Sequence, residues 1–230
     1  ALRYGQKYKI KDYQFTLYPA GHILGSAQVL VEKDNHRLVI TGDYKVGRDD
    51  TCANFKAIKC DTLITEATFG LPIFQHPDPK EEILKLLTSV KKNKRNCHIV
   101  GAYALGKAQR VMNLLRQHDY KETIYIHGSL EKLCNYYKKE KINIGDFDKV
   151  SKKDKNFYEG KIIIAPPSAL KDRWSRRFPN PIICMASGWM TVKQRAKQKL
   201  IELPLVISDH ADWNELTLCL IHISEPTRPY

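Results

Sequence analysis

Residues 19–45 read PAGHILGSAQVLVEKDNHRLVITGDYK, and this stretch decides how the rest of the chain is interpreted. Two β-branched runs, 28–32 and 37–41, flank a polar segment with an Asp-Asn pair, which predicts a β-hairpin with a tight turn. The second strand leads directly into Asp43, and His22 precedes the first strand in a loop. The two side chains can therefore meet at one rim of a sheet, where α/β proteins place their chemistry.

His22 and Asp43 carry an imidazole and a carboxylate, which are ligand types that zinc accepts in hydrolytic sites. The two residues alone do not decide the matter. A single histidine in a loop is more often an ordinary loop residue, and Gly-Asp pairs are common where strands end in turns. The small residues Gly21 and Gly25 favour a site, because they let the backbone approach another group closely.

Two further strand ends carry polar side chains. Residues 61–67 predict a third buried strand with Glu66 at its carboxyl end, and a covered glutamate needs a partner. If it is not covered, it is an ordinary surface residue. The apolar run 38–40 likewise predicts a strand covered on both faces. A short strand at 205–207 leads into Ser-Asp-His-Ala-Asp, which places His210 at another strand end.

The middle of the chain alternates between strands and helices. A proline-rich linker follows residue 71, and residues 79–90 have the apolar spacing of an amphipathic helix. Apolar strands are then expected to begin near residues 97, 123, 161 and 181, each followed by a turn or a turn and a helix. This succession predicts a parallel sheet with helices on its faces. The role of His127, after the second of these strands, is open between a loop residue, a helix cap and a substrate contact.

Seven motifs occur in a fixed order that makes the set far more specific than any one of them. They are GHILGSAQ (21–28), ITGDYK (40–45), LITEATFG (63–70), AYALGKAQR (102–110), APPS (165–168), ASGWM (186–190) and SDHADW (208–213). The ordered set resembles the ligase-associated DNA exonucleases, in the β-CASP branch of the metallo-β-lactamase superfamily. The resemblance extends over roughly residues 18–213.

The resemblance implies a fold class and a division into domains. The fold is expected to be α/β, a partial metallo-β-lactamase αββα-type domain with an inserted β-CASP α/β cap domain. Residues 1–70 would form the first part of the metallo-β-lactamase domain and residues 71–203 the cap. Residues 204–230 would return to the first domain, with an atypical tail over 221–230.

The resemblance also implies roles for four residues. His22 and Asp43 would ligate metal, with Asp43 bridging two zinc ions and serving in catalysis. Glu66 would lie close to the metal-site histidines and orient the site. His210 would contact the scissile phosphate region and support proton transfer. The implied activity is zinc-dependent phosphodiester hydrolysis.

Two departures from the family pattern limit what these 230 residues are expected to do. The His-x-His-x-Asp-His motif, source of most metal ligands in the superfamily, is absent and is expected upstream of Ala1. The final residues, IHISEPTRPY, differ from the expected Thr-His-Gly-type motif, and His222 is not assigned its role. The matched motifs then supply only His22 and Asp43, whereas a catalytic zinc needs about three protein ligands. We therefore expect this chain to be a fragment that is inactive and binds zinc poorly.

The charge balance favours a polyanionic partner. Lys and Arg number 38 against 25 Asp and Glu, a formal net charge of +13. Lys107 follows a strand and a glycine turn at a helix start, which is a place where phosphate can be held. Arg173, Arg176 and Arg177 alternate with Trp174 and Phe178, which suits a nucleic-acid channel, although a solvated charged face is as consistent with the pattern.

The composition also bounds the compartment and the class of function. The six cysteines form no Cys-x-x-Cys pair, no signal peptide is visible, and the apolar runs are too short for a membrane span, so a cytoplasmic protein with reduced thiols is expected. The favoured function is DNA exonuclease in DNA repair or end processing. An RNA-processing β-CASP nuclease and a non-catalytic nucleic-acid-binding scaffold are the alternatives. Functional association with a DNA ligase is implied by the resemblance alone.

Overall fold

A computed structural model gives the fold, and it describes residues 2–154 and 156–223, the last five of these by their backbone only. The chain forms two compact units, residues 1–75 with 209–230 and residues 76–208. The sequence had placed the domain limits at residues 70 and 203. Of the expected atypical tail, residues 221–223 belong to a helix, and residues 224–230 lie outside the described part.

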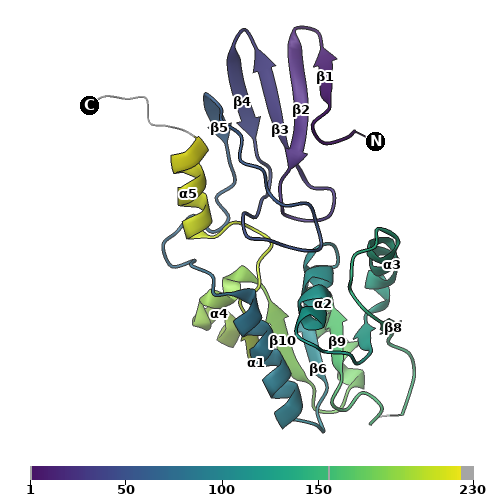
Figure 1. The fold of residues 1–230 in the computed structure, drawn as a ribbon. Coiled ribbons are helices and arrows are strands. Elements are labelled where there is room, and N and C mark those ends of the chain that lie inside the picture. Colours follow the sequence, from purple (N-terminus) through teal and green to yellow (C-terminus); the bar gives the residue numbers. More distant parts are fainter. Residues whose placement is uncertain (1, 155, 224–230) are drawn as a thin grey trace. The chain divides into compact units, whose positions relative to one another are not determined.

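The first unit, residues 1–75 with 209–230, is organised around one sheet with the strand order β1-β2-β3-β4-β5 (Figure 1). The first four strands pair antiparallel in succession, and β5 pairs parallel with β4. The strands are β1 (Lys7–Ile10), β2 (Tyr13–Pro19), β3 (Ala27–Lys33), β4 (His36–Ile40) and β5 (Thr62–Ile64).

The expected hairpin is present as β3 and β4, whose closing pair is Lys33 with His36. The two residues between them, Asp34 and Asn35, both have positive φ values, 48° and 64°. Two-residue turns of this kind match the right-handed twist of the flanking strands, and Asp and Asn tolerate the left-handed conformation. The hairpin prediction is therefore confirmed, with its turn where the Asp-Asn pair indicated.

Two expectations about burial are wrong: that the strand at residues 38–40 is covered on both faces, and that the strand at residues 61–67 is buried. Val39 is buried and packs with Leu30 and Ile58, whereas Ile40 is 39% exposed. Successive side chains of a strand point to opposite faces, so Ile40 lies on the more open face. Strand β5 is only three residues long, and its Ile64 is 53% exposed. Its carboxyl end nevertheless leads to Glu66, as expected.

Helix α5 (Trp213–Ile223) completes the described part of the first unit. Its start is fixed by a capping box, in which the Glu215 backbone N–H donates to Asp212 Oδ1 (2.9 Å) and the Asp212 N–H donates to Glu215 Oε2 (3.0 Å). None of the described helices combines the length and the apolar composition that crossing a membrane requires.

The second unit, residues 76–208, contains a six-stranded sheet with the order β11-β10-β6-β9-β7-β8. All its pairings are parallel, which confirms the predicted parallel α/β arrangement. The strands are β6 (His98–Gly101), β7 (Ile124–Ile126), β8 (Phe147–Lys149), β9 (Ile162–Ala165), β10 (Ile182–Ala186) and β11 (Leu203–Leu205). Strand β11, which the sequence assigned to the returning segment, belongs to this sheet.

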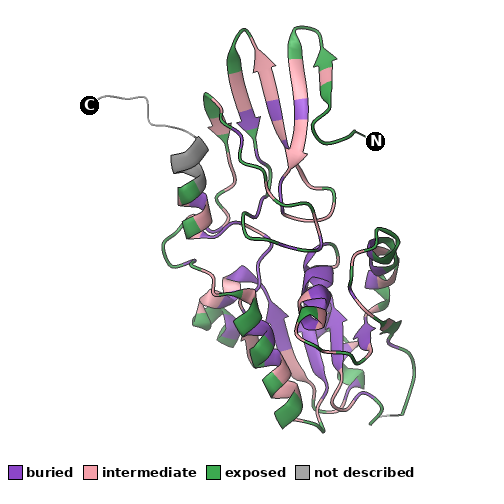
Figure 2. Cartoon of the chain, in the orientation of Figure 1, coloured by how far each residue is buried: buried purple, intermediate pink, exposed green. Residues whose placement is uncertain are grey.

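Helices flank this sheet and cover its apolar strands. Strands β6 and β9 are buried along their whole length, as Figure 2 shows. The helices are α1 (Pro79–Lys92), α2 (Lys107–Gln117), α3 (Glu131–Lys139) and α4 (Lys193–Gln198), with 3₁₀ turns η1 (Gly128–Leu130), η2 (Pro167–Lys171), η3 (Ser175–Arg177) and η4 (Gly188–Thr191). Helix α1 buries Ile83 and Leu86 one turn apart, as its apolar spacing predicted.

Candidate metal and phosphate site

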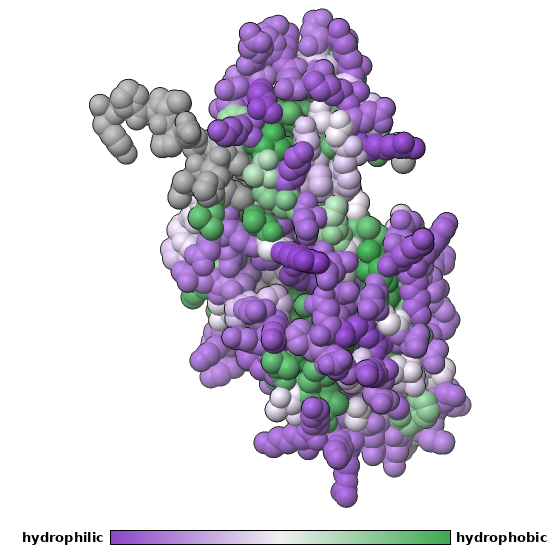
Figure 3. Space-filling model, in the orientation of Figure 1, coloured by the Kyte–Doolittle hydropathy of each residue, from purple (hydrophilic) through white to green (hydrophobic). Residues whose placement is uncertain are grey.

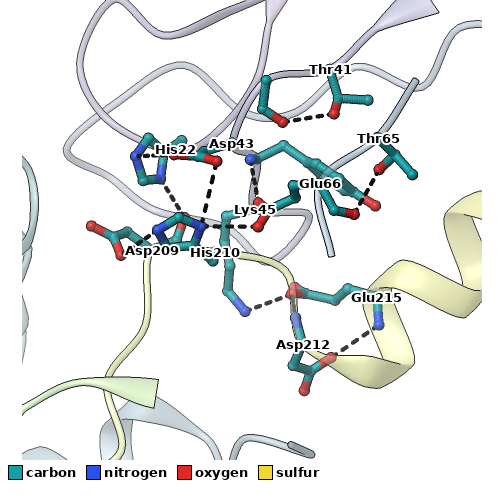
Figure 4. A network of polar contacts seen from close by, with 12 residues as sticks. His22, Thr41, Asp43, Lys45, Thr65, Glu66, Asp209, His210, Asp212 and Glu215 are labelled. Atoms are coloured by element: carbon teal, nitrogen blue, oxygen red, sulfur yellow. Dashed lines mark hydrogen bonds and ion pairs between the residues drawn. The ribbon is translucent and has the colours of Figure 1, made fainter. Parts of the chain in front are cut away.

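Four polar side chains of the first unit meet beside its sheet (Figure 4). His22 follows β2, Asp43 follows β4, Glu66 follows β5, and His210 precedes α5. His22 Nε2 lies 3.9 Å from Asp43 Oδ2, and His210 Nδ1 lies 3.9 Å from Asp43 Oδ1. The two imidazole rings are 4.7 Å apart between centroids. The structure thus brings together the four residues that the sequence singled out at strand ends, and their chemical roles stay predictions.

The His22 loop depends on Gly21. Gly21 has φ +72°, and a Cβ added there would lie 2.2 Å from the backbone oxygen of Lys45. The loop can therefore pass close to the strand-end segment only with glycine at this position. The Ser26 hydroxyl accepts hydrogen bonds from the backbone N–H groups of His22 (3.1 Å) and Ile23 (3.2 Å), which fixes the turn.

A hydrogen bond fixes the tautomer of His22. Nδ1 lies 2.8 Å from the Asp209 carbonyl oxygen, which can only accept, so Nδ1 carries the proton. Nε2 then presents a lone pair on the side of Asp43. Metal-ligating histidines typically donate their other ring N–H to a carbonyl or carboxylate in this way.

Glu66 is a buried carboxylate that holds two separate segments. Its Oε1 accepts from the Tyr44 backbone N–H (2.8 Å), and its Oε2 accepts from His210 Nδ1 (3.0 Å). Burial alone raises the pKa of Glu66, but hydrogen bonds from His210, Thr68 and Tyr44 outweigh it and hold the pKa below its ordinary value. Glu66 is therefore an ionised partner for His210, so the covered-residue interpretation of Glu66 holds.

His210 is biased toward its protonated form. Burial on its own lowers the pKa of His210, but the hydrogen bond and charge of Glu66, with the charges of Asp209 and Asp43, raise it above the ordinary value. An imidazolium beside a carboxylate can donate a proton or a hydrogen bond to an anionic group. The part in proton transfer that the resemblance implies for His210 stays a prediction.

A metal ion fits these residues to a limited extent. His22, Asp43 and His210 each offer a ligand atom, and the three atoms lie within 4.8 Å of one another. Among the side chains that the structure describes, this is the one cluster of three or more such groups. The His210 nitrogen nearest Asp43, Nδ1, donates to Glu66, so a metal could take only the other ring nitrogen, Nε2, and only in the neutral ring. His22 and Asp43 stay the predicted metal ligands, and His210 could join them through Nε2 while keeping its hydrogen bond to Glu66.

A second polar network anchors the loop that follows Asp43 to the start of helix α5. Lys45 Nζ lies 2.6 Å from Glu215 Oε2, and the Gly47 backbone N–H donates to Glu215 Oε1 (2.6 Å). The Ala211 N–H donates to the Tyr44 carbonyl at 2.6 Å. The same glutamate therefore caps α5 and anchors the loop after β4. Sequence reasoning missed this role of Glu215, although the Asp-x-x-Glu spacing of a capping box was visible.

The cationic residues predicted to contact nucleic acid lie in the second unit and differ in exposure. Lys107 is only 3% exposed, and its ammonium lies 5.1 Å from the Tyr103 ring centroid, so it offers little to an external phosphate. Gly106 caps the start of helix α2, and its backbone N–H donates to Gln109 Oε1. This N–H group is therefore already used within the helix start. In contrast, Arg173, Arg176 and Arg177 are exposed and line a shared cavity.

His127 is a helix cap. Its Nδ1 accepts from the Ser129 backbone N–H (3.1 Å) at the start of η1, and its ring packs edge-on against Trp174 with centroids 4.8 Å apart. Of the three roles left open by the sequence, the structure shows the cap.

Comparisons with known proteins show which proteins the chain is similar to. No protein-family model matches the chain. "Probable DNA ligase" of Opitutus terrae is 29% identical over 226 residues, which cover 94% of this chain and 21% of that protein. "Endoribonuclease ysh-1" of Neurospora crassa is 31% identical over 144 residues, covering 58% of this chain and 17% of that protein. The chain thus spans about a fifth of the length of these relatives.

A solved structure shares the fold. The crystal structure of a protein of unknown function from Enterococcus faecalis V583 matches with a TM-score of 0.63 at 13% identity, covering 96% of this chain and 59% of that one. At this identity the match concerns the fold alone. The sequence relatives, together with the mixed α/β architecture, carry the assignment: the chain is a relative of the β-CASP metallo-β-lactamases.

Proposed function

We propose that the protein carrying this chain is a zinc-dependent phosphodiester hydrolase that acts on nucleic acid. The observation that carries the proposal is the cluster of His22, Asp43 and His210, backed by the buried carboxylate of Glu66. Nucleases among the relatives support the reaction class.

The proposal gives the four residues two tasks: one pair would bind metal, and the other pair would serve proton transfer. His22 and Asp43 would hold the metal, and zinc bound in a two-ion site supplies hydroxide near neutral pH and charge stabilisation at the attacking and leaving oxygens. Glu66 holds His210 at a fixed orientation through the 3.0 Å hydrogen bond. His210, biased toward its protonated form, would hydrogen-bond to the phosphate or protonate the departing oxygen.

DNA is the proposed substrate, with end trimming in repair or end processing as the mode of action. The ordered motifs resemble DNA exonucleases, and the relative that matches 94% of this chain is named a probable DNA ligase. That name also supports functional association with a ligase. RNA is the second candidate, because a relative at 31% identity is named an endoribonuclease.

The test uses the protein at its natural length with end-labelled DNA and RNA. We expect release of nucleotides from DNA ends that zinc restores after chelation and that Asp43→Asn abolishes. Asp50→Asn, in the same loop region but outside the cluster, is the matched control and should retain activity. Faster cleavage of RNA would favour the second candidate. Cleavage that survives both chelator and Asp43→Asn would contradict the proposal. The 230-residue chain alone is predicted to be inactive, because its matched motifs supply only His22 and Asp43, whereas a catalytic zinc needs about three protein ligands.

A further inference from the structure

The second unit, residues 76–208, contains a cavity of about 660 Å³ with a strongly basic wall. Among its described lining residues, Asp154 supplies the one carboxylate, against five cations: Lys152, Lys153, Arg173, Arg176 and Arg177. None of these five forms an ion pair with a carboxylate in the part of the chain that the structure describes. Gathering like charges without counter-charges is unfavourable by itself. The cavity, called the basic pocket below, is therefore suited to an anionic ligand.

The lysine side of the basic pocket is built on an anchored segment. The Tyr158 hydroxyl accepts from the Ser151 backbone N–H and donates to the Ser151 carbonyl, both at 3.0 Å. Tyr158 itself is 5% exposed and packs edge-on against Phe178 with centroids 5.2 Å apart. The backbone that leads into Lys152 and Lys153 is thus tied to a buried ring.

The arginine side is anchored as well. The Arg173 backbone N–H donates to Asp172 Oδ1 (2.6 Å), and the Ser175 hydroxyl donates to the Leu170 carbonyl (3.0 Å). Arg177 Nε donates to the Trp174 carbonyl (3.0 Å). The backbone between residues 172 and 178 and the Arg177 guanidinium are therefore fixed before a ligand arrives, which lowers the entropic cost of binding.

The two aromatic rings that line the basic pocket, those of Tyr158 and Phe178, offer little surface for stacking a base. Tyr158 and Phe178 are 5% and 4% exposed. Trp174 is covered by the His127 ring and by the Arg177 guanidinium, whose carbon lies 5.5 Å from the Trp174 ring centroid. Recognition by base stacking, common in single-strand binders, is therefore disfavoured. Guanidinium and ammonium groups recognise phosphate oxygens, which are the same for every base.

We propose that the basic pocket binds the phosphodiester backbone of single-stranded nucleic acid, without a metal ion and without base preference. A concave cavity of this kind follows a flexible single strand better than the stiff rod of a duplex. The inference rests on the proposed function for the nature of its ligand, and adds where and how the strand is held. Of the nucleic-acid contacts predicted from the sequence, the three arginines are kept and Lys107 is dropped. Lys152 and Lys153 are added.

The experiment measures binding of a short fluorescein-labelled oligothymidylate to the 230-residue chain by fluorescence anisotropy, with EDTA present and at several salt concentrations. The test variant is Arg173→Gln/Arg176→Gln, which spares the Arg177 contacts. The control is Lys91→Gln/Arg95→Gln, an equal charge change at exposed residues of the same unit outside the basic pocket. Thermal unfolding of each variant verifies that it folds.

We expect the test variant to lose at least about tenfold in affinity, and the slope of log K against log salt to shrink by about 1.4, because each lost single-strand phosphate contact removes about 0.7. The control variant should bind like the unmodified chain. Equal binding by both variants would overturn the proposal. Displacement of the strand by thymidine monophosphate at equal phosphate concentration would also overturn it, because the pocket would then be a site for small anions. Tighter binding of a duplex would also overturn it. Binding is measured without metal, so its failure would count against this proposal alone, whereas normal binding together with a natural-length protein that shows no zinc-dependent cleavage would contradict the proposed function alone.

Discussion

His210 Nδ1 lies 3.0 Å from Glu66 Oε2, so the histidine at the candidate metal cluster is held by a buried carboxylate. The same carboxylate accepts from the backbone of Tyr44, the residue after Asp43. One side chain therefore fixes both a candidate proton donor and the loop that carries a candidate metal ligand. This makes Glu66 a positioning residue whose removal should disturb both.

Replacing Glu66 by alanine is expected to lower nuclease activity of the natural-length protein by about 10- to 100-fold, the usual cost of removing a group that orients a metal-site histidine. The loss should appear mainly in kcat, because Glu66 orients His210 rather than binding substrate. Glu32→Ala, on strand β3, is the control and should leave activity unchanged. An unchanged kcat in Glu66→Ala would show that the hydrogen bond to His210 has no part in the reaction.

The buried pair between Lys45 and Glu215 should matter for stability. Glu215→Ala leaves Lys45 with 10% of its side chain exposed and no carboxylate from Glu215, and it removes the cap of α5. We expect a loss of about 3 kcal/mol in the free energy of unfolding, measured with urea. The double variant Lys45→Met/Glu215→Leu should recover much of it, because no buried charge remains.

Arg48→Ala is the comparison for that experiment, since Arg48 pairs with Asp50 while 80% exposed. Its cost should stay below about 1 kcal/mol. If Glu215→Ala costs no more than Arg48→Ala, the network does not anchor the loop.

Gly21 and Gly25 give a matched test of the His22 loop. Both have positive φ, +72° and +81°, but a Cβ at Gly21 would meet the Lys45 backbone oxygen at 2.2 Å, and a Cβ at Gly25 would meet nothing within 4 Å. Gly25→Ala should therefore cost about 1 kcal/mol of conformational strain. Gly21→Ala should cost clearly more, and should weaken zinc binding because His22 is displaced. Equal costs in thermal unfolding would contradict the close approach.

His98 predicts a pH dependence of stability. It is fully buried, its Nε2 lies 2.8 Å from the Ser89 hydroxyl, and burial lowers its pKa from 6.5 to about 4. Between these values the unfolded chain binds a proton that the folded chain does not, so stability falls as pH drops from 6.5 toward 4. The loss is on the order of 3 kcal/mol, since one pH unit corresponds to about 1.4 kcal/mol.

Urea unfolding at several pH values checks this expectation, with His98→Gln as the variant that cannot titrate. That variant should lose much of the slope between pH 6.5 and pH 4. An identical slope in both proteins would show that another group is responsible.

The sequence allowed the local features with strong signals to be predicted. The Asp-Asn turn, the amphipathic spacing around Ile83 and the strand-end position of Asp43 follow from neighbouring residues, and the structure has all three. Burial was harder to predict, because an apolar run such as 38–40 does not reveal how well each face is covered.

Contacts between distant segments could not be predicted from local pattern. The carbonyl of Asp209 that fixes His22 lies 187 residues away in the chain, and Glu215 meets Lys45 across 170 residues. The burial of Lys107 also depends on how its helix packs rather than on its motif. Figure 3 shows hydrophilic side chains spread widely over the face in view, so a polar stretch of sequence does not by itself identify one binding surface.

The most direct measurement is a calorimetric titration of the 230-residue chain with zinc, in parallel with His22→Ala and with His36→Ala, a histidine of the same sheet outside the cluster. The account predicts weak binding of one zinc ion per chain, lowered at least about tenfold by His22→Ala and unchanged by His36→Ala. Zinc binding that His22→Ala leaves intact would contradict the assignment of His22 and Asp43 as metal ligands.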